Sequence, residues 1–196
     1  MGIGTIGIII VALMVAYFVM VYNRLVTHRN RFKNAFSQID VQLQRRYELI
    51  PNLVEIAKKY VTHEKETLTA VIEARNRASD ACDAASANPD KSGLVGALAQ
   101  AEQILGNAMS KLNMVMEDYP ELNADESLRD LHDELISTDN RVAYARQAYS
   151  DSVMRYNTEC EQFPAFVVAN TCNFNKAELF EAANEAVYNA PKVKFG

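Results

Sequence analysis

The first twenty-two residues constrain this chain more than any other part of its sequence. Residues 3–22 contain no Asp, Glu, Lys, Arg or His. A helix of this length spans about 30 Å, the thickness of the hydrocarbon core of a bilayer. A helix also satisfies its own backbone hydrogen bonds in lipid. We therefore predict a transmembrane anchor at residues 1–22, whose apolar side chains include Ile3, Ile8, Ile9, Ile10, Val11, Leu13, Val15, Phe18, Val19 and Val21.

A cleaved signal peptide and a buried core helix are the alternatives to an anchor. A signal peptide begins with basic residues and has a shorter apolar centre, whereas no Lys or Arg precedes this run. Basic residues follow it instead, and under the positive-inside rule they place the N-terminus outside and the remaining chain in the cytoplasm. We expect these residues to set the orientation and contact lipid headgroups: Arg24, Arg29, Arg31 and Lys33.

The composition excludes several classes of protein. The net charge is −5 and the pI about 5.3, so the basic footprint of a nucleic-acid-binding protein is absent. Three cysteines without CxxC spacing argue against a disulfide framework and agree with a reducing cytoplasm. Seven glycines and five prolines in 196 residues imply few turns and long helices.

Apolar residues recur at alternating intervals of three and four in residues 32–71, 94–119 and 128–163. This alternation is typical of the seam of a coiled-coil-like bundle, and no segment alternates with the period of two that a strand requires. The sequence therefore predicts an all-α fold. We expect the anchor to be followed by an antiparallel up-and-down bundle at residues 23–190, of the four-helix type, and a tail at 191–196.

Two turns divide the bundle, at residues 88–93 and 119–123, which are rich in Asn, Pro, Asp and Gly. Asn123 with Glu126 resembles a capping box for the helix that follows. Pro164 is expected to close that helix. Asn175 with Glu178 repeats the capping pattern before a short helix that should end ahead of Pro191.

The first helical segment is too long for its partners. One helix over residues 23–87 would extend about 97 Å, against about 39 Å for 94–119 and about 60 Å for 124–163. Pro51 removes a backbone donor, and residues 62–67 interrupt the apolar stripe with polar side chains. We favour a kink at Pro51 within a four-helix bundle; an unbroken helix would leave an uncovered stalk.

Several motifs resemble those of the LemA family of bacterial membrane proteins. The strongest is SQIDVQLQRRYELIPNLV at residues 37–54, followed by HEKETL at 63–68 and EARNRA at 73–78. YPEL at 119–122, DELISTDNRVAYAR at 133–146 and APKVKF at 190–195 extend the resemblance over nearly the whole chain. Membership implies an N-terminal anchor in a bacterial inner membrane and a helical bundle, with no established catalytic activity.

Adjacent arginines are the most informative charges in the soluble part. Arg45 and Arg46 point about 100° apart on a helix, so at most one faces the seam. We expect them to pair within the bundle with Glu134 and Asp139; contact with anionic lipid or a partner is the alternative. The motif and this polar layer together supply the candidate residues Asp40, Gln42, Pro51, Asn52, Asn140 and Arg141.

The sequence offers no constellation typical of a catalytic or metal site. His28, His63 and His132 lack further ligands at helical spacing, and we expect them to be solvated. No phosphate-binding glycine loop and no nucleophile beside a base is present in the sequence. We therefore expect no enzymatic activity and no cofactor.

Aromatic and apolar residues outside a paired seam are candidates for association. The uncovered length of the first helix suggests one such surface at Phe32, Phe36 and Ile39, and the segment after Pro164 suggests another at Phe166 and Phe174. A flap that closes one end of the bundle is the alternative for the second.

These features predict a membrane-anchored scaffold that forms homo-oligomers or docks another membrane or cytoplasmic protein. A membrane-tethered signalling or regulatory module is the alternative, with the kink at Pro51 as its physical basis. Membrane lipid is an expected partner in both cases, and nucleic acid is not.

Overall fold

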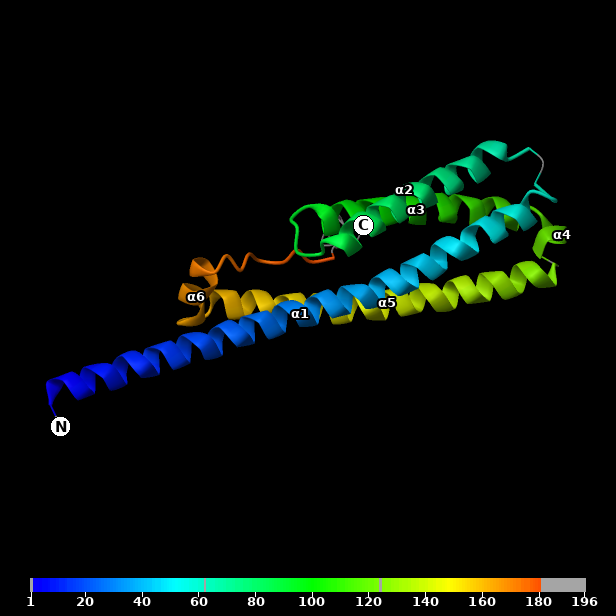
Figure 1. Ribbon diagram of the computed structural model, residues 1–196. Coiled ribbons are helices and arrows are strands. Elements are labelled where there is room, and N and C mark those ends of the chain that lie inside the picture. The colour runs from blue at the N-terminus through cyan, green and yellow to red at the C-terminus, as the bar shows by residue number, and fades with distance from the viewer. Residues whose placement is uncertain (1, 62, 124, 181–196) are drawn as a thin grey trace, which may run out of the picture.

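The computed structural model describes residues 2–61, 63–123 and 125–180, and these residues contain six helices and no strand. In chain order the helices are α1 (Ile3–Ala57), α2 (Lys65–Ala87), α3 (Leu94–Glu117), α4 (Pro120–Asn123), α5 (Glu126–Glu161) and α6 (Ala165–Thr171). They form an elongated antiparallel bundle from which the N-terminal part of α1 projects (Figure 1). The predicted all-α bundle is confirmed.

Helix α1 extends unbroken from the apolar N-terminal segment into the centre of the bundle. Its first part is long and apolar enough to cross a membrane, and its side chains from Ile6 to Met20 are exposed. Beyond residue 22, every third or fourth side chain is buried, as an amphipathic helix requires. The two parts of α1 therefore face different surroundings: one is apolar all round, and the other is apolar on one stripe.

Helix α5 covers the buried stripe of α1 along its whole length. Its 36 residues extend about 54 Å, which matches the roughly 52 Å of α1 beyond residue 22. Helices α2 and α3, with 23 and 24 residues, form a second antiparallel pair that packs on α1 through α2. The excess length of the first segment is thus resolved by α5, and the bundle consists of two antiparallel helix pairs, α1–α5 and the α2–α3 hairpin.

The aromatic residues predicted as an association surface on the first helix lie in the core instead. The ring centroid of Phe32 is 5.0 Å from that of Tyr156, and that of Phe36 is 5.5 Å from that of Tyr149. Ile39 is fully buried beside them. The predicted exposure of this surface is wrong, because α5 is long enough to cover it.

The helix does not break at Pro51, one of the two positions at which the sequence allowed a break. Pro51 lacks the N–H that would bond to the Tyr47 carbonyl four residues earlier. In the structure this carbonyl accepts a hydrogen bond of 2.9 Å from Nε of Arg75, on α2. A side chain from another helix thus replaces the missing backbone donor, and α1 continues to Ala57. The chain turns at residues 58–64, which overlap the polar segment that was the second predicted break.

Two details at the helix ends differ from the sequence predictions. Helix α5 is capped by Asp125, whose carboxylate accepts a hydrogen bond from the backbone N–H of Leu128, and not by Asn123. The helix predicted to begin at Asn175 is not formed in residues 175–180, which run extended along α5. The remainder of that predicted helix and the tail at 191–196 lie outside the described residues.

Side chains of α5 explain why residues 174–180 stay extended. The hydroxyl of Tyr149 donates to the carbonyl of Glu178, and the hydroxyl of Tyr156 donates to that of Asn175. The amide of Asn157 bonds both the N–H and the carbonyl of Ala177. Backbone groups that a helix would have used internally are therefore bonded to α5.

The role of Arg75 can be tested by a double-mutant cycle with Pro51. Arg75→Ala should lower the free energy of unfolding by about 1–3 kcal/mol, because the Tyr47 carbonyl loses its donor. Pro51→Ala restores the helical N–H, so it should stabilise the protein and reduce the cost of Arg75→Ala by roughly 1 kcal/mol. Urea unfolding in detergent, followed by circular dichroism, measures both values. Arg77→Ala, at an exposed position of α2, is the control; equal losses in both backgrounds would contradict the explanation.

Candidate functional site: a buried polar layer around Glu102

A carboxylate lies on the apolar face of α3. Glu102 is four residues after Leu98 and three before Leu105, so it shares their stripe. Leu98 and Leu105 are fully buried, and Glu102 is only 4% exposed. A buried charge has to be paired and hydrogen-bonded to be tolerated in a core.

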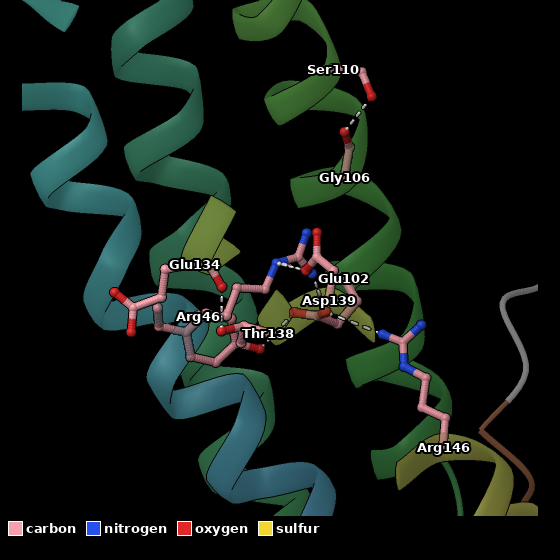
Figure 2. A network of polar contacts seen from close by, with 9 residues as sticks. Arg46, Glu102, Gly106, Ser110, Glu134, Thr138, Asp139 and Arg146 are labelled. Atoms are coloured by element: carbon pink, nitrogen blue, oxygen red, sulfur yellow. Dashed lines mark hydrogen bonds and ion pairs between the residues drawn. The ribbon is translucent and has the colours of Figure 1, made fainter. Parts of the chain in front are cut away.

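Three side chains from two other helices satisfy Glu102. Nη1 of Arg46 donates to Oε2 at 2.8 Å, and Nη2 of Arg146 donates to the same oxygen at 3.1 Å. The hydroxyl of Tyr47 donates to Oε1 at 2.7 Å. Figure 2 shows the guanidinium groups of Arg46 and Arg146 directed at Glu102 from α1 and α5.

The layer extends to α2 and to a second carboxylate. Nε of Arg46 lies 3.1 Å from Oδ1 of Asp139, on α5. The hydroxyl of Tyr47 is also 3.2 Å from the carbonyl oxygen of Ala78, on α2. Burial raises the pKa of Tyr47, and the adjacent Glu102 carboxylate raises it further, so the hydroxyl keeps its proton. All four long helices therefore meet at this layer.

The position of the layer gives it a structural role. Helix α3 makes its extensive contacts with α2, and α5 makes its own with α1. The bonds from Arg46 and Arg146 to Glu102 thus connect the α1–α5 pair to the α2–α3 hairpin. Buried ion pairs add little net stability because desolvation offsets their attraction, but they penalise arrangements in which the charges lose their partners. The layer can therefore fix the register of the α2–α3 hairpin on the α1–α5 pair.

The predicted pairing of the adjacent arginines is present, on two different surfaces. Arg45 pairs with Glu134 at the solvent-exposed side of the α1–α5 contact, while Arg46 enters the buried layer with Asp139. The hydroxyl of Thr138 is turned to its own helix, where it donates to the carbonyl of Glu134 at 2.8 Å (Figure 2).

The other predicted motif residues lie outside this layer. Asp40 accepts hydrogen bonds from Ser86 and Cys82, which is a separate contact between α1 and α2. The side-chain oxygen of Gln42 is buried without a partner among the described residues. The exposed positions comprise Pro51, Asn52, Asn140 and Arg141.

Sequence reasoning missed Glu102 and Arg146. The signal was present for Glu102, because a charged residue interrupts an otherwise apolar stripe on α3. The same signal was present for Arg146, which is four residues after the buried Val142 and three before the buried Tyr149 on α5. Its guanidinium carbon lies 4.2 Å from the centroid of the Phe180 ring, a contact between segments that the helical pattern does not connect.

The juxtamembrane basic residues pair mainly within the chain. Arg24 pairs with Glu159 of α5, while Arg29 and Lys33 both pair with Asp90, in the turn between α2 and α3. Partial burial would raise the pKa of Asp90, but the hydrogen bonds from Arg29 and Lys33 outweigh it and lower the pKa to about 2. Their predicted contact with lipid headgroups stays a prediction, and Arg31 is exposed beside them.

The layer has no chemistry typical of catalysis. Its groups are a carboxylate held by two arginines, a phenol that keeps its proton and the Asp139 carboxylate paired with Arg46, so each acidic group already has a partner. Burial also raises the pKa of the Cys82 and Cys160 thiols, which keeps them protonated. Among the described residues no cluster of three His, Cys, Asp or Glu side chains is placed to hold a metal.

Substitution of Glu102 tests the role of the layer. Glu102→Gln should lower the free energy of unfolding by about 3–5 kcal/mol, because two buried arginines lose their counter-charge. Glu134→Gln makes the same chemical change in an exposed pair and should cost less than about 1 kcal/mol. Urea unfolding in detergent measures both. Similar small losses for the two variants would show that the layer does not hold the two helix pairs together.

The Asp90 contact predicts a pH dependence. Because the folded-state pKa of Asp90 lies below its ordinary value of 3.8, its ion pairs stabilise the fold above that value and are lost as the pH falls towards about 2. Asp90→Asn should therefore lower the melting temperature at neutral pH, and its difference from the unmodified protein should shrink below about pH 4. Asp130→Asn, at an exposed site of α5, is the control. A difference that stays constant with pH would contradict this assignment.

Known proteins resemble the chain over most of its length. The magnetosome proteins MamQ 2 and MamQ 1 of Paramagnetospirillum magneticum are each 26% identical over 191 residues, covering 90% of this chain and 70% of the relative. Magnetosome protein MamQ of Magnetospirillum gryphiswaldense is 24% identical over 176 residues, covering 82% and 65%. The sequence profile of the LemA family matches residues 35–195, which include α2 to α6 and α1 from residue 35 onwards. The chain belongs to the LemA family.

Proposed function

We propose that this protein is a non-enzymatic scaffold, anchored by the N-terminal part of α1 in the inner membrane of a bacterium. Its N-terminus lies outside and its bundle in the cytoplasm, where it self-associates or docks a partner protein. The observation that carries the proposal is the continuity of α1: one helix includes both the apolar segment and the central element of the bundle.

Continuity matters because a helix without a break transmits orientation. A flexible linker would let a tethered domain rotate freely, whereas α1 fixes the axis of the bundle relative to the anchor. Contacts with α5 and with the Glu102 layer stiffen α1 within the bundle. A surface on the bundle is thereby held at a set height above the bilayer, which suits a protein that positions others.

The names of the relatives support a role other than catalysis. They refer to the magnetosome and describe no reaction. The charged groups of the layer also pair with one another, so none of them is free to react with a substrate.

Self-association requires a surface other than the one predicted at Phe32, Phe36 and Ile39, which α5 covers. Outward-facing apolar side chains remain on α5 itself, namely Ile136, Tyr144 and Met154. Ile136 and Met154 are separated by about five helical turns and therefore lie on one line. Tyr144 is 79% exposed between them, so α5 offers an association face.

The signalling alternative has less support than the scaffold. It depended on a kink at Pro51 that could shift between packing states. Helix α1 continues through Pro51, and the Tyr47 carbonyl is bonded to Arg75. We therefore favour the scaffold.

The mass of the full chain in mild detergent tests self-association. We expect a defined oligomer by light scattering over a range of protein concentrations. Tyr144→Glu combined with Met154→Glu should reduce the mass to that of the monomer, because two charges on the face oppose its burial. Met114→Glu, which places the same charge at an exposed methionine of α3, is the control and should leave the oligomer intact. A monomer at all concentrations would contradict self-association and direct the search to a separate partner.

A further inference from the structure

The loop and helix that follow α5 form an apolar tip. No charged residue occurs between Glu161 and Lys176. Phe163 is 83% exposed, and Phe166 and Val167 of α6 are 41% and 49% exposed. Surface hydrophobic residues are usually scattered singly, so three large ones within five residues call for an explanation.

This tip lies beside the candidate membrane span and not below it. An apolar groove of about 850 Å³ separates the two, with Phe163, Pro164 and Val167 on one side. The other side consists of α1 side chains between Ile10 and Met20. These α1 residues rise about 15 Å and lie within residues 3–22. Figure 1 shows α6 alongside the N-terminal half of α1, at the end of the bundle from which the span projects.

Charged and aromatic residues mark a boundary next to the tip. Glu161 pairs with Lys176, and Arg24 pairs with Glu159, so the first charges on all three chain segments lie at this end of the bundle. The ring of Tyr22 packs against that of Phe174, with 5.5 Å between the two ring centroids. Aromatic rings and flanking charges of this kind are typical of the membrane–water interface.

The backbone of the tip is suited to lipid. The N–H groups of Phe166, Val167 and Cys172 donate to carbonyls of Gln162, Pro164 and Val168. The hydroxyl of Thr171 donates to the carbonyl of Val167. Polar groups bonded in this way remove most of the cost of leaving water.

We propose that residues 163–168 are a second membrane-inserted element, and that the groove between this element and α1 holds an acyl chain of a phospholipid. The groove is continuous with the surface of the anchor, whose exposed side chains already face hydrocarbon. Its lining side chains are apolar or aromatic, with the hydroxyl of Tyr17 as the one polar side-chain group among them, which matches an acyl chain better than a polar ligand. The inference rests on the anchor in the proposed function, but not on self-association. With two insertions instead of one, the bundle is held at a fixed tilt to the bilayer.

Tryptophan fluorescence tests the depth of this element, because the chain contains no Trp. Phe163→Trp is prepared in the full chain and reconstituted into phosphatidylglycerol and phosphatidylcholine vesicles with brominated acyl chains. Phe18→Trp in the anchor is the control for lipid exposure, and Met114→Trp, at a 67% exposed position of α3, is the control for water exposure. Bromolipid quenches only tryptophans in the hydrocarbon, and iodide only those in water.

We expect Phe163→Trp to lose emission to bromolipid by a fraction close to that of Phe18→Trp, and to resist iodide. Met114→Trp should behave in the opposite way. Val167→Trp, which places the probe in the groove, should also be quenched by bromolipid, and circular dichroism checks that each variant keeps its helical content.

Other outcomes would overturn the inference. Quenching of Phe163→Trp by iodide would place the tip in water. Protection from both quenchers would mean that protein, and not lipid, covers it, such as a second copy of this chain. If Phe18→Trp also escapes bromolipid, the anchor itself is wrong and the proposed function fails; if only Phe163→Trp escapes, the second insertion alone is wrong.

Discussion

Helix α1 joins a segment that is apolar all round to an amphipathic one, and the remaining structure depends on how the apolar stripe of the second is covered. Its first turns present apolar side chains on all sides, which suits lipid. Beyond Tyr22 the apolar side chains gather on one stripe, which has to be buried along about 52 Å. A shorter partner would leave Phe32 or Val54 in water. The length of α5 and the placement of Tyr149 and Tyr156 opposite Phe32 follow from this requirement.

Apolar packing alone does not determine how the α2–α3 hairpin packs on the α1–α5 pair. The buried side chains of α2 include Ala74, Ala78, Cys82 and Ala85 at intervals of three and four, so a slip by one helical turn would exchange one small side chain for another. Glu102 removes this degeneracy, because only one register places its carboxylate within reach of Arg46, Tyr47 and Arg146. A charge that adds little stability can in this way select one arrangement among several.

Local patterns in the sequence predicted the helices, their apolar faces and the two turns, since these follow from periodicity and composition. Features that depend on distant residues could not be predicted in the same way. Pro51 predicts a break unless Arg75, 24 positions later, is known to reach the Tyr47 carbonyl. Asn175 predicts a helix start unless Tyr156 is known to bond its carbonyl. Arg45 and Arg46 were matched to the correct acidic residues because helical geometry limits their directions, whereas Glu102 was overlooked within an apolar stripe.

The membrane-proximal end combines orientation with folding. Positive charges after a span set its topology, yet Arg24, Arg29 and Lys33 also pair with Glu159 and Asp90, which belong to α5 and to the turn before α3. The basic side chains that follow the candidate span therefore also connect it to both helix pairs of the bundle. Because these charges are partly neutralised by their partners, attraction to anionic lipid is weaker than their number implies. Apolar contact by the segment after α5 then becomes the stronger means of holding this end against the bilayer.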